Sequence, residues 1–239
     1  LIKQGGYQMR TRFKKWRPLY GLYVLIYLPW FFFLEKAITD ATPNMHIIDI
    51  AFDHAIPFCE YFIIPYYFWF VYIVGACLFM MIYATDKEFI RMALSLIIGM
   101  SVCLIICMIY PNGLNLRPDT LPDNIFGTLV ASLYEVDTPY NVFPSIHVYN
   151  SVVIHIALNK CEALKNHKAV RVCSLVICVL ICLSTLFLKQ HSITDLIGGC
   201  AFAAVMYMLL YVVNYSRFRK CASEEMCDTK SCEAIESNE

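Results

Sequence analysis

The sequence predicts an all-α, polytopic membrane protein built as one helical bundle. Two observations carry this prediction: 59% of the 239 residues are apolar and only 16% are charged, and the charges leave long uncharged windows between them. A soluble domain usually carries about 25% charged residues, so the composition argues against a soluble globular protein or a disordered chain. The formal net charge is zero, which argues against nucleic acid as a partner because no global field recruits a polyanion.

Six windows without Asp, Glu, Lys or Arg are long enough to cross a bilayer, which takes roughly 17–25 residues. They cover residues 18–34, 61–85, 92–116, 138–159, 172–188 and 196–216. Because these windows nearly fill the chain, we expect one six-span membrane domain over residues 18–216. It follows a basic N-terminus, residues 1–17, and precedes a disordered tail, residues 217–239.

The basic residues predict the orientation of these spans. With six spans, 16 of the 19 Lys and Arg residues fall on the side of the termini, and Lys36, Arg117 and Lys189 fall opposite. Since basic residues are retained on the cytoplasmic side, we expect cytoplasmic termini and outer first, third and fifth loops. Codons for Gly5-Gly6 before Met9 are compatible with a bacterial ribosome-binding site. We therefore expect a bacterial cell-membrane protein whose reading frame is over-extended by residues 1–8.

Three segments with polar chemistry meet at the outer face in this topology. They are Arg117-Pro118 after the third window, Pro144-Ser145-Ile146-His147 in the fourth, and Lys189-Gln190-His191 with Asp195 before the sixth. The topology is derived without these segments, so their convergence at one face is the strongest functional signal in the sequence.

Each segment carries groups suited to phosphate chemistry. His191 and Asp195 are four residues apart and share a face if they lie on a helix, where the carboxylate can orient a nucleophilic imidazole. Ser145 is a candidate helix cap, and the free N–H groups of a helix start bind phosphate. His147 in that first turn is placed to protonate a leaving oxygen, and the forked donors of Arg117 suit phosphate oxygens.

These segments resemble, in order and spacing, the three motifs of the type 2 phosphatidate phosphatase superfamily, over roughly residues 53–215. The resemblance implies that His191 is the nucleophile that forms a phosphohistidine, that Asp195 orients it, and that His147 is the general acid. It also implies that Arg117 and Ser145, with nearby N–H groups, bind the phosphoryl oxygens. No metal and no other cofactor is implied.

Two positions depart from the superfamily pattern. Tyr110 stands where a Lys is usual and Thr185 where an Arg is usual, so two phosphate-binding cations are missing. Lys189 is our candidate to supply one of them. The reduced cationic set resembles the branch of inositol phosphorylceramide synthases and sphingomyelin synthases, which keep a His-His-Asp triad. Hydrolysis of a lipid phosphate and transfer of a head group both stay open.

The expected partner is a membrane lipid phosphate, pyrophosphate or phosphodiester that is taken from the bilayer. Asp137 and Asn141 lead into the second segment and are candidates for head-group binding, whereas the loop acids Asp49 and Asp53 are expected to be solvated. His155, in mid-span, is expected to make a structural hydrogen bond. The alternative function is a catalytically inactive transporter or scaffold with the same fold, although a transporter favours polar residues in the middle of several spans.

Overall fold

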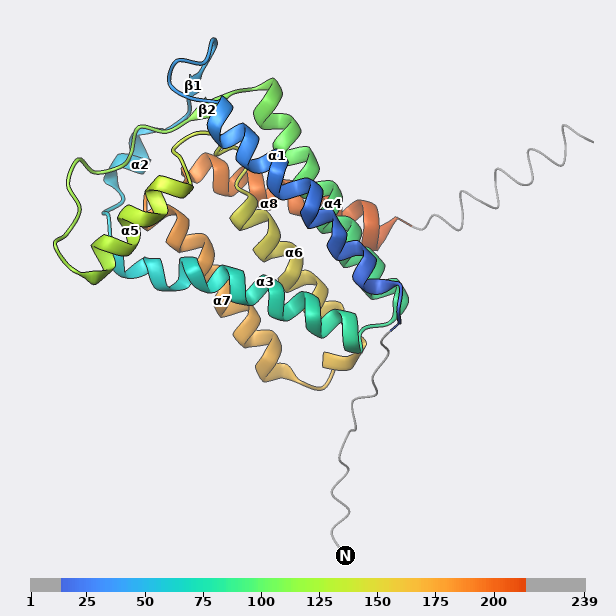
Figure 1. The fold of residues 1–239 in the computed structure, drawn as a ribbon. Helices are drawn as coiled ribbons and strands as arrows, with labels where there is room; N and C mark the ends of the chain where they lie inside the picture. The colour runs from blue at the N-terminus through green and yellow to red at the C-terminus, as the bar shows by residue number, and fades with distance from the viewer. Residues whose placement is uncertain (1–13, 214–239) are drawn as a thin grey trace, which may run out of the picture.

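The computed structural model describes residues 14–213 (Figure 1). The expected basic N-terminus lies mostly outside this range, and the expected tail, residues 217–239, lies entirely outside it. The first half of the chain begins with a 3-10 helix Arg17–Tyr23 that continues as α1 Val24–Ala37, followed by β1 His46–Ile47 and α2 Ala51–Ala55. A 3-10 turn Glu60–Phe62 then continues as α3 Ile63–Tyr83, and α4 Asp86–Ile109 and β2 Asn112–Gly113 follow. The second half contains α5 Ile125–Val136, α6 Ile146–Lys160, a 3-10 turn Glu162–Leu164, α7 Lys168–Phe187, and α8 Ile193–Tyr207, which continues as a π-helical turn Met208–Val212.

Five helical stretches are long and apolar enough to cross a membrane. They are Arg17–Ala37, Glu60–Tyr83, Asp86–Ile109, Lys168–Phe187 and Ile193–Val212, and they correspond to five of the six uncharged windows. The window over residues 138–159 differs, because only α6 is helical there and its 15 residues extend about 22 Å. Residues 138–145 of this window are irregular backbone. The chain is therefore a mostly helical integral membrane protein with five candidate spans and a shorter sixth helix.

The short helix α6 lies at the centre of the bundle, packed on α3, α4, α7 and α8 (Figure 1). Eight of its residues are buried. The Tyr149 hydroxyl donates a hydrogen bond of 2.7 Å to the carbonyl of Ser95 in α4. This contact passes directly over Gly99, where an added Cβ would meet the tyrosine hydroxyl at 2.0 Å. Since its neighbours enclose α6, its length does not have to match the thickness of the bilayer.

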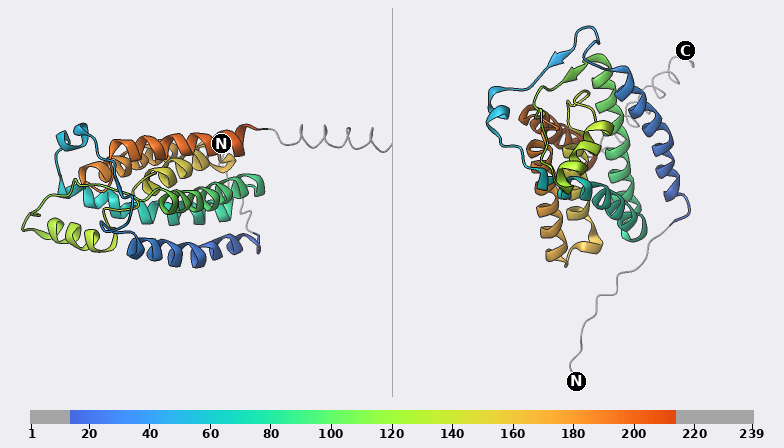
Figure 2. Two further views of the ribbon diagram at one scale, coloured as in Figure 1. Left: turned by 90° about the horizontal axis from the view of Figure 1, so that it is seen from above. Right: turned by 60° about the vertical axis from the view of Figure 1, so that its left-hand side comes forward.

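The helices run side by side between two ends of the molecule, as Figure 2 shows. The Arg17 end comprises the start of the first helix, the α3–α4 turn, the α6–α7 loop and the end of α8. Contacts across this end include Glu162 N–H to the Glu88 carboxylate at 2.8 Å and the Arg91 guanidinium over the Tyr211 ring at 5.2 Å. We call the opposite end the His191 end. It carries the connecting segments of residues 38–59, 110–145 and 188–192, which include both short strands, α2 and α5. The helices run alternately in the two directions between these ends, while six crossings and the membrane side of each end stay predictions.

Arg17 is fully buried and closes the C-terminus of α3. Its guanidinium donates to the carbonyls of Met81 at 2.7 Å and Ala84 at 2.9 Å, and to the carboxylate of Asp86 at 2.8 Å. The last carbonyls of a helix have no partner within the helix, and a cation there also suits the helix dipole. Arg17 therefore fixes the first helix to the turn between α3 and α4.

A two-stranded parallel sheet holds the loops together at the His191 end. It pairs His46 with Asn112 and Ile47 with Gly113, and so joins the α1–α3 loop to the segment after α4. The side chain of Asn112 is fully buried. Its carbonyl oxygen accepts the N–H groups of Val142 at 3.0 Å and Phe143 at 2.8 Å. The sheet thus supports the irregular segment that leads into α6.

Candidate active site

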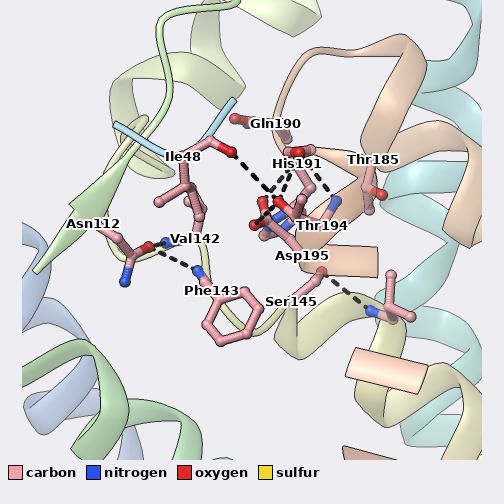
Figure 3. A network of polar contacts seen from close by, with 12 residues as sticks. Ile48, Asn112, Val142, Phe143, Ser145, Thr185, Gln190, His191, Thr194 and Asp195 are labelled. Carbon is pink, nitrogen blue, oxygen red and sulfur yellow. Dashed lines mark hydrogen bonds and ion pairs between the residues drawn. The ribbon is translucent and has the colours of Figure 1, made fainter. Parts of the chain in front are cut away.

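His191 and Asp195 meet at the N-terminus of α8, although not as two residues of one helix. Ser192 is the N-cap of α8, so His191 lies in the turn before it. The ring Nδ1 of His191 is 3.3 Å from Asp195 Oδ2, and the same oxygen accepts the Ser192 N–H at 2.8 Å (Figure 3). The expectation of a shared helical face is corrected in this respect: a capping box, in which the third helical residue reaches back to the N-cap, brings the pair together.

Asp53 completes this helix start from a distant part of the chain. It is 1% exposed and accepts the Ser192 hydroxyl at 2.6 Å and the Ile193 N–H at 2.9 Å. The expectation that Asp53 is a solvated loop acid is therefore wrong. The physical reason is that the first N–H groups of a buried helix need acceptors. No sequence pattern links α2 to α8, so nothing in the sequence indicated this role.

The side chain of Lys189 points toward the segment that contains Asp53. The backbone of Lys189 has a left-handed conformation, with φ of 55°. Its ammonium donates to the carbonyls of Asp53 at 2.6 Å and Ile56 at 2.5 Å, and the side chain is almost entirely buried. Burial lowers the pKa of Lys189, although the charge of Asp53 opposes that shift. The ammonium is thus bound by main-chain oxygens of the α2 segment.

Close approach of α8 to the start of α6 brings the two histidines together. Ser145 is the N-cap of α6, as expected, and its N–H donates to the carbonyl of Asp195 at 3.3 Å. An added Cβ at Gly199 would lie 2.9 Å from the carbonyl oxygen of Ser145, so only glycine allows this approach without a shift. The ring centroids of His147 and His191 are 5.7 Å apart as a result.

The ring of His147 lies between two aromatic side chains of α3. Its centroid is 4.7 Å from that of Tyr66 and 4.6 Å from that of Trp69. The Tyr66 hydroxyl in turn donates to the carboxylate of Asp137. Within residues 14–213 no side-chain or main-chain group hydrogen-bonds the ring nitrogens of His147. Aromatic contacts therefore set the position of this ring and leave its nitrogens open to a ligand.

Arg117 links the end of α5 to the loop of His191. Its guanidinium donates to the carbonyl of Tyr134 at 3.1 Å and to that of Asp137, stacks on the Tyr134 ring at 4.0 Å, and donates to Gln190 Oε1 at 2.6 Å. Burial lowers the pKa of Arg117, and the nearby acidic groups oppose the shift. The predicted phosphate ligand thus contacts Gln190, the residue directly before His191.

The two head-group candidates occupy different surroundings. Asp137 lies beside Tyr66 and near His147, whereas the Asn141 amide donates to the carboxylate of Glu35 in α1 at 3.1 Å. Glu35 also accepts the N–H and the hydroxyl of Thr138, at 3.0 and 2.6 Å. Irregular backbone that is shielded from water needs such internal partners. Asn141 and Glu35 therefore hold the segment before α6, a role that the sequence did not indicate.

A groove of about 280 Å³ leads from the bundle surface to His147. Its wall is mostly aromatic and comes from α1, α3 and α5, with Tyr27, Phe31, Tyr67 and Phe70 among its members. Asp137 and His147 form its polar part. A larger apolar cleft of about 400 Å³ between α3 and α7 contains none of the predicted site residues. Only the first of these two spaces reaches a site histidine, His147.

Tyr110 and Thr185, which stand where the superfamily usually has cations, make other contacts. The Tyr110 ring stacks on His46 at 4.3 Å, and the buried Thr185 carbonyl accepts the N–H groups of Gln190 and His191 at 3.0 and 3.1 Å. His155, as expected, makes a structural contact, with Ser174 Oγ at 3.1 Å. Among the described residues, no group of three or more His, Cys, Asp or Glu side chains is arranged to hold a metal ion.

Comparison with protein families adds to this geometry. The model of the PAP2 superfamily matches residues 88–219. The chain belongs to the PAP2 superfamily. The matched region spans more than half of the chain and includes Arg117, Ser145, His147, His191 and Asp195. PAP2 proteins usually have phosphatase or phosphotransferase activity. No curated protein and no solved structure matches the chain.

Proposed function

We propose that this PAP2 protein is a lipid phosphatase or phospholipid head-group phosphotransferase that works through a phosphohistidine. The observation that carries the proposal is the position of His147, with its ring 5.7 Å from His191 and in contact with an aromatic groove. His191 is in turn oriented by Asp195. A nucleophile held by a third group, with an acid beside it, is the arrangement that covalent phosphoryl transfer needs.

The proposed reaction has two steps. His191 attacks phosphorus through Nε2, since Nδ1 faces Asp195, and a P–N bond forms while the P–O bond to the leaving group breaks. His147 gives its proton to the leaving oxygen. Water, in a phosphatase, or a lipid alcohol, in a transferase, then attacks the phosphohistidine. His147 takes the proton of the attacking oxygen, and the P–N bond breaks to restore His191.

Arg117 and the start of α6 are the proposed ligands of the phosphoryl oxygens. The Arg117 guanidinium is adjacent to the His191 loop and supplies fixed positive charge, while Ser145 begins a helix whose first N–H groups favour anions. Lys189 is two residues from His191, and we propose that it acts as a background charge because its ammonium is bound to carbonyls.

The groove supports a substrate that enters from the lipid phase. Its aromatic wall suits a hydrocarbon chain, and its polar part holds Asp137 and His147, so a phosphate at the head of such a chain would reach His147. Asp137 is our candidate contact for a head group or an acceptor hydroxyl. The reduced cationic set supports the branch of inositol phosphorylceramide and sphingomyelin synthases, with head-group transfer as its reaction.

We further propose that α6 is a sixth crossing, completed by residues 138–145, and that the His191 end faces outward from the cell membrane. The enclosure of α6 by four other helices supports the first point, and the distribution of basic residues supports the second. Cysteine labelling at Asp119→Cys in intact cells tests the orientation. Labelling only after permeabilisation would invert it.

The test of function uses the full-length protein, purified in mixed micelles with a panel of lipid phosphates and phosphodiesters. Released phosphate and new lipid species are measured together for the wild type, for His191→Ala and for His155→Ala as a matched control. Phosphate release that depends on His191 would identify a phosphatase, and a new phospholipid without free phosphate would identify a transferase. A folded wild type that is silent on the whole panel would contradict the proposal and favour an inactive scaffold or transporter.

A further inference from the structure

A buried glutamine stands directly before the proposed nucleophile. Gln190 is 2% exposed, and its main-chain N–H and that of His191 share the carbonyl of Thr185. A buried amide side chain is expected to have its donors and its acceptor paired. Figure 3 shows Gln190 beside His191 in the turn that leads into α8.

The orientation of this amide follows from its contact with Arg117. A guanidinium can only donate hydrogen bonds, so the oxygen of the amide must face it, and Oε1 is indeed 2.6 Å from Arg117 Nη2. The Nε2 group therefore points away from Arg117. Nε2 is buried and has no acceptor among residues 14–213.

Buried donors without a partner are found at both ends of the described chain, because His167, Arg171 and Tyr211 near the Arg17 end also have one. Arg17 and Arg117 both have a buried Nε without a partner in the described part of the chain, so that atom does not distinguish the two ends. The Gln190 amide differs, because Arg117 fixes its direction and it belongs to the residue directly before His191. Leaving a buried donor unpaired is unfavourable, and a ligand that supplies an acceptor would remove this penalty.

We propose that the Gln190 amide is a ligand of a phosphoryl oxygen, held in place by Arg117, and that it replaces a cation missing at Tyr110 or Thr185. The inference rests on the proposed phosphate chemistry and adds a binding residue to it. An amide N–H donates to a phosphate oxygen without carrying charge. Arg117 and Gln190 thus act as one unit, in which the guanidinium supplies the charge and positions the neutral donor.

Two variants of Gln190 test this role. In Gln190→Glu the carboxylate keeps an acceptor for Arg117, so stability should be unchanged or higher, but its charge compensates Arg117 and opposes an anion whatever the role of the amide. Gln190→Met is therefore decisive, because it removes the NH₂ donor without adding charge, and it should bind a phosphate analogue more weakly. Asn159→Asp makes the amide-to-acid change far from the site.

The probe is orthovanadate, and its binding is measured with the full-length protein by the rise in melting temperature and by inhibition of turnover. We expect the vanadate affinity of Gln190→Glu and Gln190→Met to fall by about 10- to 100-fold, the range for one hydrogen bond to a charged group. Asn159→Asp should match the wild type. Wild-type affinity in Gln190→Met would overturn the inference alone. A wild type that neither binds vanadate nor turns over any lipid would overturn the proposed function and this inference with it.

Discussion

Two arginines close helix ends at opposite ends of the molecule, and they differ in what balances their charge. Arg17 donates to the last carbonyls of α3 and also binds the carboxylate of Asp86. Arg117 donates to the last carbonyls of α5, but its remaining partner is the neutral amide of Gln190. No carboxylate of residues 14–213 lies within ion-pair distance of Arg117.

The difference shows that capping a helix does not by itself define what an arginine does. Both side chains satisfy main-chain oxygens that the helix leaves unpaired, so both contribute to the fold. At the Arg17 end the charge is compensated within the protein. At the His191 end no carboxylate of the described residues pairs with it, and we propose that an anion does. This contrast predicts which substitutions affect stability and which affect turnover.

The largest effect should come from substituting the two histidines at the His191 end, with His155 in the other half of the bundle as the comparison. His191→Ala should lower turnover by about 10⁴-fold or more, because the nucleophile is lost. His147→Ala should lower it by about 10²- to 10⁴-fold. His155→Ala, which removes a contact with Ser174, should stay within a few-fold of the wild type. Wild-type turnover in His191→Ala would refute the assignment, and quantitative expression of each variant controls for folding.

The arginine pair should separate activity from stability. Arg117→Ala should reduce kcat by about 10²- to 10³-fold, as expected for loss of a group that stabilises charge in the transition state. Arg17→Ala should leave the kcat of the folded protein near that of the wild type, but reduce stability by about 1–3 kcal/mol because carbonyls of α3 lose their donor. Turnover and thermal unfolding in detergent measure the two effects. Equal loss of kcat in both variants would erase the contrast between the ends.

A third comparison concerns glycines. Gly199→Ala should reduce turnover by about tenfold or more, since its Cβ would push against Ser145 and displacements of about 1 Å in a catalytic site have effects of up to about 10²-fold. Gly75→Ala is the matched control, because no atom lies within 4 Å of its added Cβ. It should leave turnover unchanged. If both variants behaved alike, the close approach of α6 and α8 would not matter for catalysis.

The smallest effect should come from the segment before α6. Glu35→Gln should lower stability by about 1 kcal/mol, because the amide offers one acceptor oxygen where the carboxylate offers two. Turnover should fall only slightly. Lys36→Gln, at the exposed neighbouring position, is the control. Melting temperatures of both variants test this, and a larger change in the Lys36 variant would show that Glu35 is not the anchor of residues 138–141.

The sequence predicted the parts of the fold that depend on local composition. Uncharged windows located five candidate spans, and the type of residue at Ser145 located the start of α6. Hydropathy alone places residues 138–145 in the same window as α6, because they contain no charged residue. They are nevertheless irregular backbone, bound by Asn112 and Glu35. Hydropathy reports what a segment contains and not which distant side chains pair its backbone.

The site was predictable to a similar extent. Spacing indicated that His191 and Asp195 belong together, although the structure joins them through a capping box and not along a helical face. Asp53 was misjudged, since its partners at Ser192 and Ile193 lie about 140 residues away in the sequence. Gln190 gave no signal because a single glutamine has no pattern, and only its contact with Arg117 gives its amide a direction.

The anchoring of Thr138 by Glu35 has a consequence for how the chain is assembled during synthesis. Domains are generally made from the N-terminus onward, so α1 with its carboxylate and α2 with Asp53 emerge before the segments that they later hold. The carboxylates of Glu35 and Asp53 gain their distant partners only when residues 138–141 and 192–193 emerge. The family match, residues 88–219, does not include Glu35 or Asp53. A chain that began at residue 88 would have the proposed catalytic residues without the two carboxylates that bind the backbone beside them.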